Sequence, residues 1–148
     1  MLCKFYKGVA KLMSRKHFVL STRTLVSKRN VTQSFGSDNT IYVPLAVMEE
    51  IEHKYSDQIS ERGKIARETL EYLGSFHYED LKKGVVQKNG SILVVPTNFY
   101  EEKLDKSVER SELSKLDRRI LQTCCGIKNK VPKDEPVVLV SKKPSLRK

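Results

Sequence analysis

Short runs of consecutive apolar residues recur along this chain and constrain its fold more than any other feature. Phe18–Leu20, Thr40–Val43 and Val137–Val140 are almost wholly apolar, and helix-like patterns separate them. A strand that is apolar throughout must be covered on both faces, which is typical of parallel strands packed between two layers of helices. The pattern therefore predicts an α/β fold, a three-layer α/β/α sandwich with a mostly parallel central sheet.

Amphipathic patterns and helix-ending residues mark the helices between these strands. Pro44 suits the first position of a helix, and Asn89-Gly90 between two β-branched runs is typical of a tight β-hairpin. Glycine commonly follows the last helical residue, which places helix ends near Gly74 and at Gly126. We thus expect helices from Pro44 to about Tyr55, from about Ser60 to Leu73 and from about Lys115 to Cys125, with hairpin strands at Val85–Val86 and Ile92–Val95.

The excess of positive charge is concentrated at the N-terminus. The 148 residues include 28 basic and 18 acidic ones, a net charge of +10, yet no acidic residue precedes Asp38. We expect a basic N-terminal extension over residues 1–16, followed by one domain over residues 17–148. A solvated tail, an amphipathic helix and a nucleic-acid contact remain open interpretations of the extension, whose basic residues are Lys4, Lys7, Lys11, Arg15 and Lys16.

The cysteines and histidines lack the spacing of a metal site or a disulfide framework. Cys124 and Cys125 are adjacent, Cys3 is remote from both in sequence, and no Cys-x-x-Cys or paired-histidine motif occurs. We expect buried thiols in a reducing compartment, which favours a cytoplasmic protein without zinc. No apolar run is long enough to cross a bilayer, so no membrane span is expected.

Five successive segments together resemble the motifs of a PIN domain. They are Phe18–Arg23, Val43–Ile51, Gly63–Arg67, Leu116–Leu121 and Val137–Lys142, in this order. Asn89–Val94 also resembles an insertion typical of the PIN domain that precedes the ATPase part of PhoH-like proteins. The resemblance covers about residues 17 to 147 and implies a site at the carboxyl ends of the parallel strands.

The resemblance also implies three or four acidic residues that bind Mg²⁺ or Mn²⁺ for the hydrolysis of nucleic acid. Position by position, the second and third acids match Glu50 and Asp117. Ser21 stands at the first acidic position and Lys143 at the fourth, while Arg23 replaces a polar residue that is usually asparagine. The site is therefore expected to be a degenerate acidic site, without a bound metal or other cofactor.

The two remaining acids also have structural interpretations. The segment from Ser114 to Asp117 fits a capping box, in which Asp117 serves the helix N-terminus. Glu50 lies in a charge-rich stretch that would ordinarily face solvent. Arg67 is expected either to pair with one of these acids or to contact a phosphate. The sequence alone leaves these alternatives open.

A fixed cation near the metal position weighs against catalysis. Lys143 or Arg23 would repel a unit charge about 4 Å away by about 4 kcal/mol at an effective dielectric of 20, a loss of roughly a thousandfold in affinity. We therefore predict a domain that does not cleave and that binds nucleic acid, in the first place RNA, or an acidic protein partner. The residues expected to contact this ligand are Arg23, Arg67, Lys142 and Lys143, with Lys4, Lys7, Lys11, Arg15 and Lys16 of the extension.

Two alternative functions stay open. A weak ribonuclease dependent on Mg²⁺ or Mn²⁺ would use Glu50, Asp117 and a third acid such as Asp38 or Glu49. A pure interaction module, for example a nuclease inhibitor, would dock through an N-terminal helix. The oligomeric state does not follow from the sequence.

Overall fold

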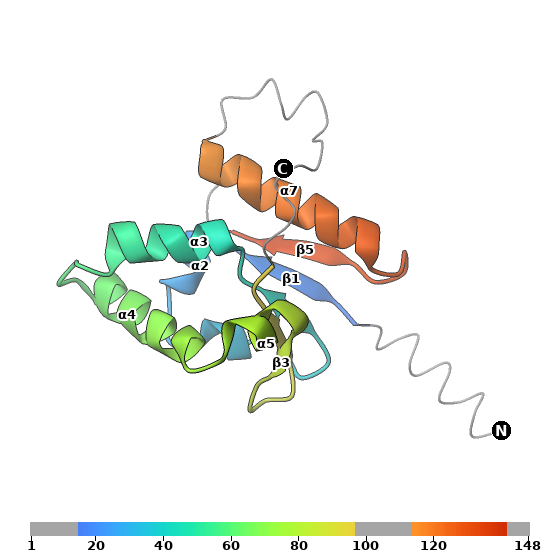
Figure 1. Ribbon diagram of the computed structural model, residues 1–148, viewed down its shortest axis with the longest axis horizontal. Helices are drawn as coiled ribbons and strands as arrows, with labels where there is room; N and C mark the ends of the chain where they lie inside the picture. The colour runs from blue at the N-terminus through green and yellow to red at the C-terminus, as the bar shows by residue number, and fades with distance from the viewer. Residues whose placement is uncertain (1–14, 97–113, 142–148) are drawn as a thin grey trace.

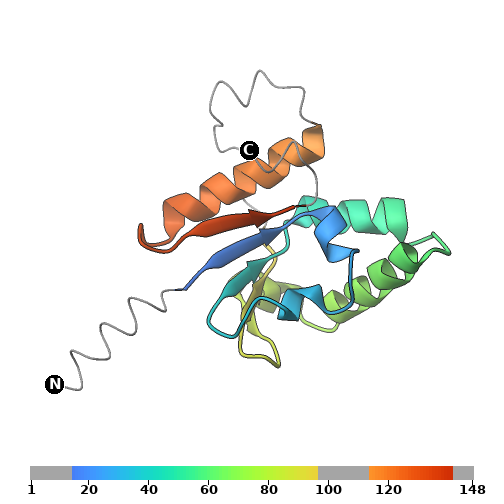
Figure 2. The ribbon, with the colours of Figure 1, turned by 180° about the vertical axis from the view of Figure 1, so that it is seen from behind.

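A computed structural model of the chain describes residues 15–96 and 114–141 (Figure 1 and, from behind, Figure 2). Strands and helices alternate along most of this part. In chain order the elements are β1 (His17–Leu20), α2 (Thr22–Leu25), the 3-10 helix η1 (Val31–Gln33), β2 (Thr40–Tyr42), α3 (Leu45–Glu50), the π-helix η2 (Ile51–Tyr55), α4 (Glu61–Gly74), α5 (Tyr78–Lys83), β3 (Val85–Val86), β4 (Ile92–Val94), α7 (Lys115–Lys130) and β5 (Val137–Val140).

The strands form one five-stranded sheet in the order β3-β4-β2-β1-β5. β1 is parallel to both β2 and β5, and β2 is parallel to β4, so Phe18 lies beside Ile41 on one side and Val138 on the other. Among the described strands only β3 is antiparallel to its neighbour, because it forms the predicted hairpin with β4. The predicted mostly parallel sheet with a small hairpin is therefore confirmed.

Helices flank this sheet (Figure 1). α7 runs along β5 and packs against α3, α4 packs against η2 and α2, and α5 packs against β4. The predicted α/β architecture is thus confirmed. None of the helices in the described part combines the length and the apolar character needed to cross a membrane.

The hydrophobic core lies between the sheet and its helices. Val19, Leu20, Ile41 and Leu93, which come from three neighbouring strands, are fully buried. Because consecutive residues of a strand point to opposite faces, burial of both Val19 and Leu20 shows that β1 is covered on both faces. The edge strand β5 differs, since Val138 is 38% exposed. The inner strands are therefore more deeply buried than this edge strand.

Helix α7 is longer than predicted, and the prediction that Gly126 ends it is wrong. The helix continues to Lys130, and Gly126 is buried within it. A glycine inside a helix costs about 1 kcal/mol relative to alanine, but burial of Ile127 in the core offsets this cost. The helix ends before Pro132, because Val131 adopts the extended conformation that a following proline favours.

Sequence patterns do not predict three short helical segments, α2, η1 and α5. They contain four, three and six residues, which is too few for a helical period to be recognised. The end of α5 does have a local signal, since Gly84 follows it with a φ of +117°, a conformation that favours glycine. Short segments of this kind are fixed by the surrounding packing rather than by their own pattern.

The predicted helix after Pro44 changes its hydrogen-bond pattern part of the way along. Its first part, α3, is α-helical, whereas its second part, η2, is a π-helix. The backbone N–H of Ser56 donates to the carbonyl oxygen of Ile51, five residues earlier, at 3.1 Å. π turns are rare and frequently occur at functional sites, which draws attention to the side chains on this turn.

A buried histidine joins three segments near the amino ends of the strands. His17 on β1 is hydrogen-bonded through Nδ1 to the Tyr42 hydroxyl at 2.9 Å and through Nε2 to Oε1 of Glu135 at 2.7 Å. Close by, Arg15 donates to Oγ1 of Thr40 at 3.1 Å. Burial and, to a smaller extent, the charge of Glu135 raise the pKa of Tyr42 to about 12, against a lowering effect of Arg15.

The raised pKa of Tyr42 predicts a loss of stability at high pH. An unfolded tyrosine ionises at about pH 10.0, whereas Tyr42 stays protonated in the fold up to about pH 12. The stability that this difference provides is complete below pH 10.0 and is lost as the pH rises towards 12. In urea denaturation between pH 10.0 and about 12, the free energy of unfolding of Tyr42→Phe should fall less steeply with pH than that of the parent. The control Tyr78→Phe, at an exposed tyrosine, should show the same fall as the parent. An equally steep fall for Tyr42→Phe would contradict the assignment.

Candidate functional site

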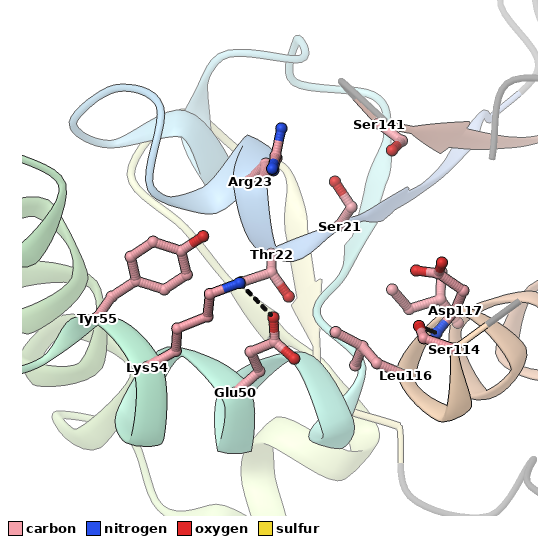
Figure 3. Close-up of a pocket in the computed structure, with 11 residues that line it drawn as sticks. Ser21, Thr22, Arg23, Glu50, Lys54, Tyr55, Ser114, Leu116, Asp117 and Ser141 are labelled. Carbon is pink, nitrogen blue, oxygen red and sulfur yellow. Dashed lines mark hydrogen bonds and ion pairs between the residues drawn. The ribbon is translucent and has the colours of Figure 1, made fainter. Parts of the chain in front are cut away.

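A cavity of about 300 Å³, which we call the strand-end pocket, lies at the carboxyl ends of β1 and β5 (Figure 3). Ser21 directly follows β1 and Ser141 directly follows β5, and the pairing of these two strands places both serines in the pocket. Its described lining consists of Ser21, Thr22, Arg23, Glu50, Lys54, Tyr55, Ser114, Leu116, Asp117, Ile120 and Ser141.

The structure brings together four residues that the sequence singles out. Ser21, Arg23, Glu50 and Asp117 all line the strand-end pocket, although up to 96 positions separate them in the sequence. Glu50 comes from the end of α3 and Asp117 from the first turn of α7, so each acid belongs to a different wall of the pocket (Figure 3). The expected location of the site at the carboxyl ends of the strands agrees with this geometry.

The π-helix η2 adds two side chains that the sequence does not single out, Lys54 and Tyr55. On a regular α-helix, residues four positions apart share a face and the next residue turns away from it. The wider π turn keeps both Lys54 and Tyr55 on the side of Glu50. In Figure 3 all three side chains extend into the same space, and the Tyr55 hydroxyl points into the pocket.

Glu50 is paired with a lysine of its own helix. Nζ of Lys54 lies 3.9 Å from Oε1 of Glu50, with the lysine side chain 58% exposed and the glutamate side chain 28% exposed. Nζ of Lys54 also lies 5.6 Å from the centroid of the Tyr55 ring. A signal for this contact is present in the sequence, because a glutamate followed four positions later by a lysine commonly forms an ion pair on a helix.

Asp117 lies at the start of α7 and is 3% exposed. Its backbone N–H donates to Oγ of Ser114 at 3.1 Å, so Ser114 is the N-cap of the helix, as the capping-box motif predicts. Both residues also line the strand-end pocket. Asp117 therefore has a place at the helix terminus and in the pocket at once.

Hydroxyl groups line the part of the pocket next to β1. Oγ1 of Thr24 donates to the carbonyl oxygen of Val140 at 2.8 Å, so the Ser21 hydroxyl, 3.0 Å from Thr24 Oγ1, acts as the donor to it. Thr22 is 5% exposed, and its Oγ1 has no hydrogen-bond partner within the described part of the chain. A buried hydroxyl without a partner costs about 1–3 kcal/mol, so a ligand that bonds to Thr22 would remove this penalty.

The two arginines singled out from the sequence have different positions. Arg23 is exposed at the pocket, and no ion pair or hydrogen bond of its side chain occurs within residues 15–96 and 114–141. Arg67 does not line the pocket. Its Nη1 donates to the carbonyl oxygens of Ser56 at 2.9 Å and Gln58 at 2.7 Å, which holds the loop between η2 and α4.

The other basic residues that the sequence singles out do not meet at the described pocket. Arg15 and Lys16 precede β1 and therefore lie at the amino ends of the strands, whereas the pocket lies at the carboxyl ends. Five more residues fall outside the described residues, and they are Lys4, Lys7, Lys11, Lys142 and Lys143.

Neither candidate for a third acid lines the strand-end pocket. Asp38 precedes β2, so it lies towards the amino ends of the strands, and it is exposed. Glu49 is also exposed and lines a neighbouring hollow instead. Glu50 and Asp117 are therefore the carboxylates of the described pocket lining.

The neighbouring hollow, which we call the helix groove, has a volume of about 490 Å³. It runs between α7 and the continuous helix of α3 and η2. Because Glu50, Lys54 and Leu116 line both spaces, the helix groove adjoins the strand-end pocket. The remaining lining residues of the groove are Ala46, Glu49, His53, Lys115 and Arg119.

The described lining does not fit the divalent cation that the family resemblance implies. One or two carboxylates can be enough for Mg²⁺, but here the Lys54 ammonium group already lies 3.9 Å from the Glu50 carboxylate. Across residues 15–96 and 114–141, no three His, Cys, Asp or Glu side chains are grouped closely enough to hold a metal ion. Both observations weigh against metal binding by this lining.

Comparison with known families agrees with the fold. No curated protein matches the chain. A family model described as a PIN domain matches residues 18–148, which include the whole described pocket lining from Ser21 to Ser141. This match extends over most of the sequence, and the chain therefore belongs to the PIN domain family.

Proposed function

We propose that this PIN domain binds single-stranded nucleic acid, in the first place RNA, without a metal ion and without cleaving it. One observation carries the proposal: the Glu50 carboxylate, which would be a metal ligand in a nuclease of this family, is paired with Lys54 at 3.9 Å. Ser21 stands at the first acidic position of the motif and supplies a hydroxyl instead of a carboxylate.

The charge of Lys54 weighs against metal binding beside Glu50. Two unit charges about 4 Å apart repel each other by about 4 kcal/mol at an effective dielectric of 20, and this figure doubles for a divalent ion. Solvent screening lowers the effect, because the Lys54 side chain is 58% exposed. A repulsion of only about 3 kcal/mol would still weaken metal binding more than a hundredfold.

Positive charge around the pocket supports nucleic acid as the ligand. Arg23 is exposed at the pocket, and Lys115 is exposed on the helix groove. Lys142 and Lys143 follow Ser141 in the sequence, and the chain as a whole carries a net charge of +10. Side chains of this kind bind phosphates with little dependence on base sequence. We also propose that this chain is related to the PIN domain of PhoH-like proteins, and the β3–β4 hairpin at the resembling segment supports this relationship.

Binding and cleavage separate the proposal from the ribonuclease alternative. A fluorescently labelled RNA of about eight nucleotides should bind in the presence of EDTA, and anisotropy should show the same affinity with millimolar Mn²⁺. Gel analysis after incubation with Mg²⁺ or Mn²⁺ should show no more product than Asp117→Asn gives. Cleavage that requires Asp117 would establish the nuclease instead, and failure to bind RNA or DNA would favour an acidic protein as the partner.

A further inference from the structure

The charges in the strand-end pocket do not favour a phosphate group inside it. Its described lining contains two cations, Arg23 and Lys54, and two carboxylates, Glu50 and Asp117. These formal charges cancel, and the Glu50 carboxylate lies beside the one ammonium group that would attract a phosphate. An anion would therefore gain little electrostatic energy by entering the pocket.

The lining instead suits a neutral, flat ring that carries hydrogen-bonding groups. Leu116 and Ile120 supply apolar surface, and the Tyr55 ring adds an aromatic wall whose hydroxyl points into the pocket (Figure 3). Thr22 supplies a buried hydroxyl that has no partner within the described residues. Pockets for small organic groups combine such apolar walls with a few converging polar atoms, and their volumes begin at about 300 Å³.

We propose that the strand-end pocket holds one unstacked nucleobase, whose edge bonds to Thr22, while the phosphates on either side stay outside. This inference rests on the proposed function. Recognition of single-stranded RNA commonly uses bases that are turned out of the stack and bound in pockets. The carboxylates of Glu50 and Asp117 then accept hydrogen bonds from amino groups of the base, a role that needs no metal ion.

We expect the phosphate next to the bound base to lie in the helix groove. The groove adjoins the pocket at Lys54, and Lys115 and Arg119 line it on the side of α7. Glu49 and Glu50 line the side of α3, so the phosphate is expected against α7. Arg23 lies at the pocket on the other side of Lys54 and is available for the second phosphate. The strand therefore passes over the pocket with one base turned inward.

The test compares strands that differ in a single base. The first probe is a labelled abasic RNA backbone of about eight nucleotides. The second probe has the same backbone with one central base, which is adenine, cytosine, guanine or uracil in four separate strands. Anisotropy should show that the best of these bases tightens binding roughly tenfold. Thr22→Val should reduce this gain about threefold and leave the salt dependence unchanged. Because the Thr22 hydroxyl has no partner in the described structure, removing it should not destabilise the fold, and this variant should melt at or above the parent's temperature.

Charge variants provide the opposite control. Lys115→Met should lower the slope of log affinity against log salt by about one and keep the gain from the base. Lys88→Met removes an exposed lysine from the β3–β4 hairpin and should change neither quantity. Tyr55→Phe, which keeps the ring and removes the hydroxyl, replaces Thr22→Val if that variant does not fold.

The outcomes separate this inference from the proposed function. Equal binding of strands with and without a base would overturn the base pocket and leave nucleic-acid binding in place. A salt slope changed by Thr22→Val would likewise show that a phosphate occupies the pocket. If none of the strands binds, the proposed function fails and the base pocket fails with it.

Discussion

Replacing Gly63 by alanine is expected to destabilise the domain by about 3 kcal/mol or more. A Cβ atom at this position would lie 2.0 Å from the backbone carbonyl oxygen of Gln58 and 2.7 Å from its carbonyl carbon. That carbonyl cannot easily move aside, because it accepts a hydrogen bond from Arg67 at 2.7 Å. The clash falls where the loop after η2 meets the first turn of α4, whose N-cap Ser60 also bonds to the Gly63 N–H.

A second glycine of the same helix is the matched control. Gly74 ends α4, and a Cβ atom there would meet no other atom within 4 Å. Gly74→Ala should therefore leave stability unchanged or raise it by up to about 1 kcal/mol, because alanine has the higher helix propensity. Urea denaturation of both variants, read as free energies of unfolding, makes the comparison. Similar values for the two would show that the Gly63 contact is not rigid.

Replacing Gln87 by leucine is expected to cost about 3 kcal/mol, because it leaves several buried polar groups without partners. Oε1 of Gln87 accepts from the hydroxyls of Thr32 at 3.0 Å and Tyr72 at 2.8 Å. Its Nε2 donates to the Thr32 carbonyl oxygen and to Oγ of Ser91, both at 2.9 Å. One buried amide thus connects η1, α4 and the β3–β4 hairpin.

A graded variant distinguishes the loss of this network from the loss of one bond. Tyr72→Phe removes a single donor, and Oε1 of Gln87 keeps its bond to Thr32, so a cost of about 1 kcal/mol is expected. Hydrogen exchange of the hairpin amides should accelerate in Gln87→Leu and much less in Tyr72→Phe. Equal costs for the two variants would mean that the amide is not the centre of the network.

The parts of the fold that follow from the sequence are those with a local signal. Runs such as Val137–Val140 mark strands, and the capping residues Ser60 and Ser114 mark helix starts, where each side chain accepts the expected backbone N–H. The end of α7 does not follow, because burial of Ile127 outweighs the tendency of Gly126 to stop a helix. Tertiary packing determines where such a helix ends, and the residues adjacent in sequence give no signal for it.

Some residues of the candidate site can likewise be predicted from the sequence, and others cannot. Motif order and the strand-end rule place Ser21, Glu50 and Asp117 together, since each lies next to an element that the sequence predicts. The pairing of Lys54 with Glu50 has the four-residue spacing of a helical ion pair, which the sequence does show. The inward position of Tyr55 depends on the π turn, for which the sequence offers no recognisable pattern. The Thr22 hydroxyl, which has no partner among the described residues, depends on α2, a helix too short to be predicted.

The pairing of β1 with β5 also determines when the sheet can be completed during folding. These neighbouring strands lie at opposite ends of the described chain, with His17 opposite Val137. Closing such a long loop makes folding slow compared with folding through local contacts. During synthesis β1 must wait for almost every other element before its second neighbour emerges. Ser21 and Ser141 meet only then, so a ribosome-bound chain that lacks β5 has every described lining residue of the pocket except Ser141, and the wall beside Ser21 is completed only when that last strand docks.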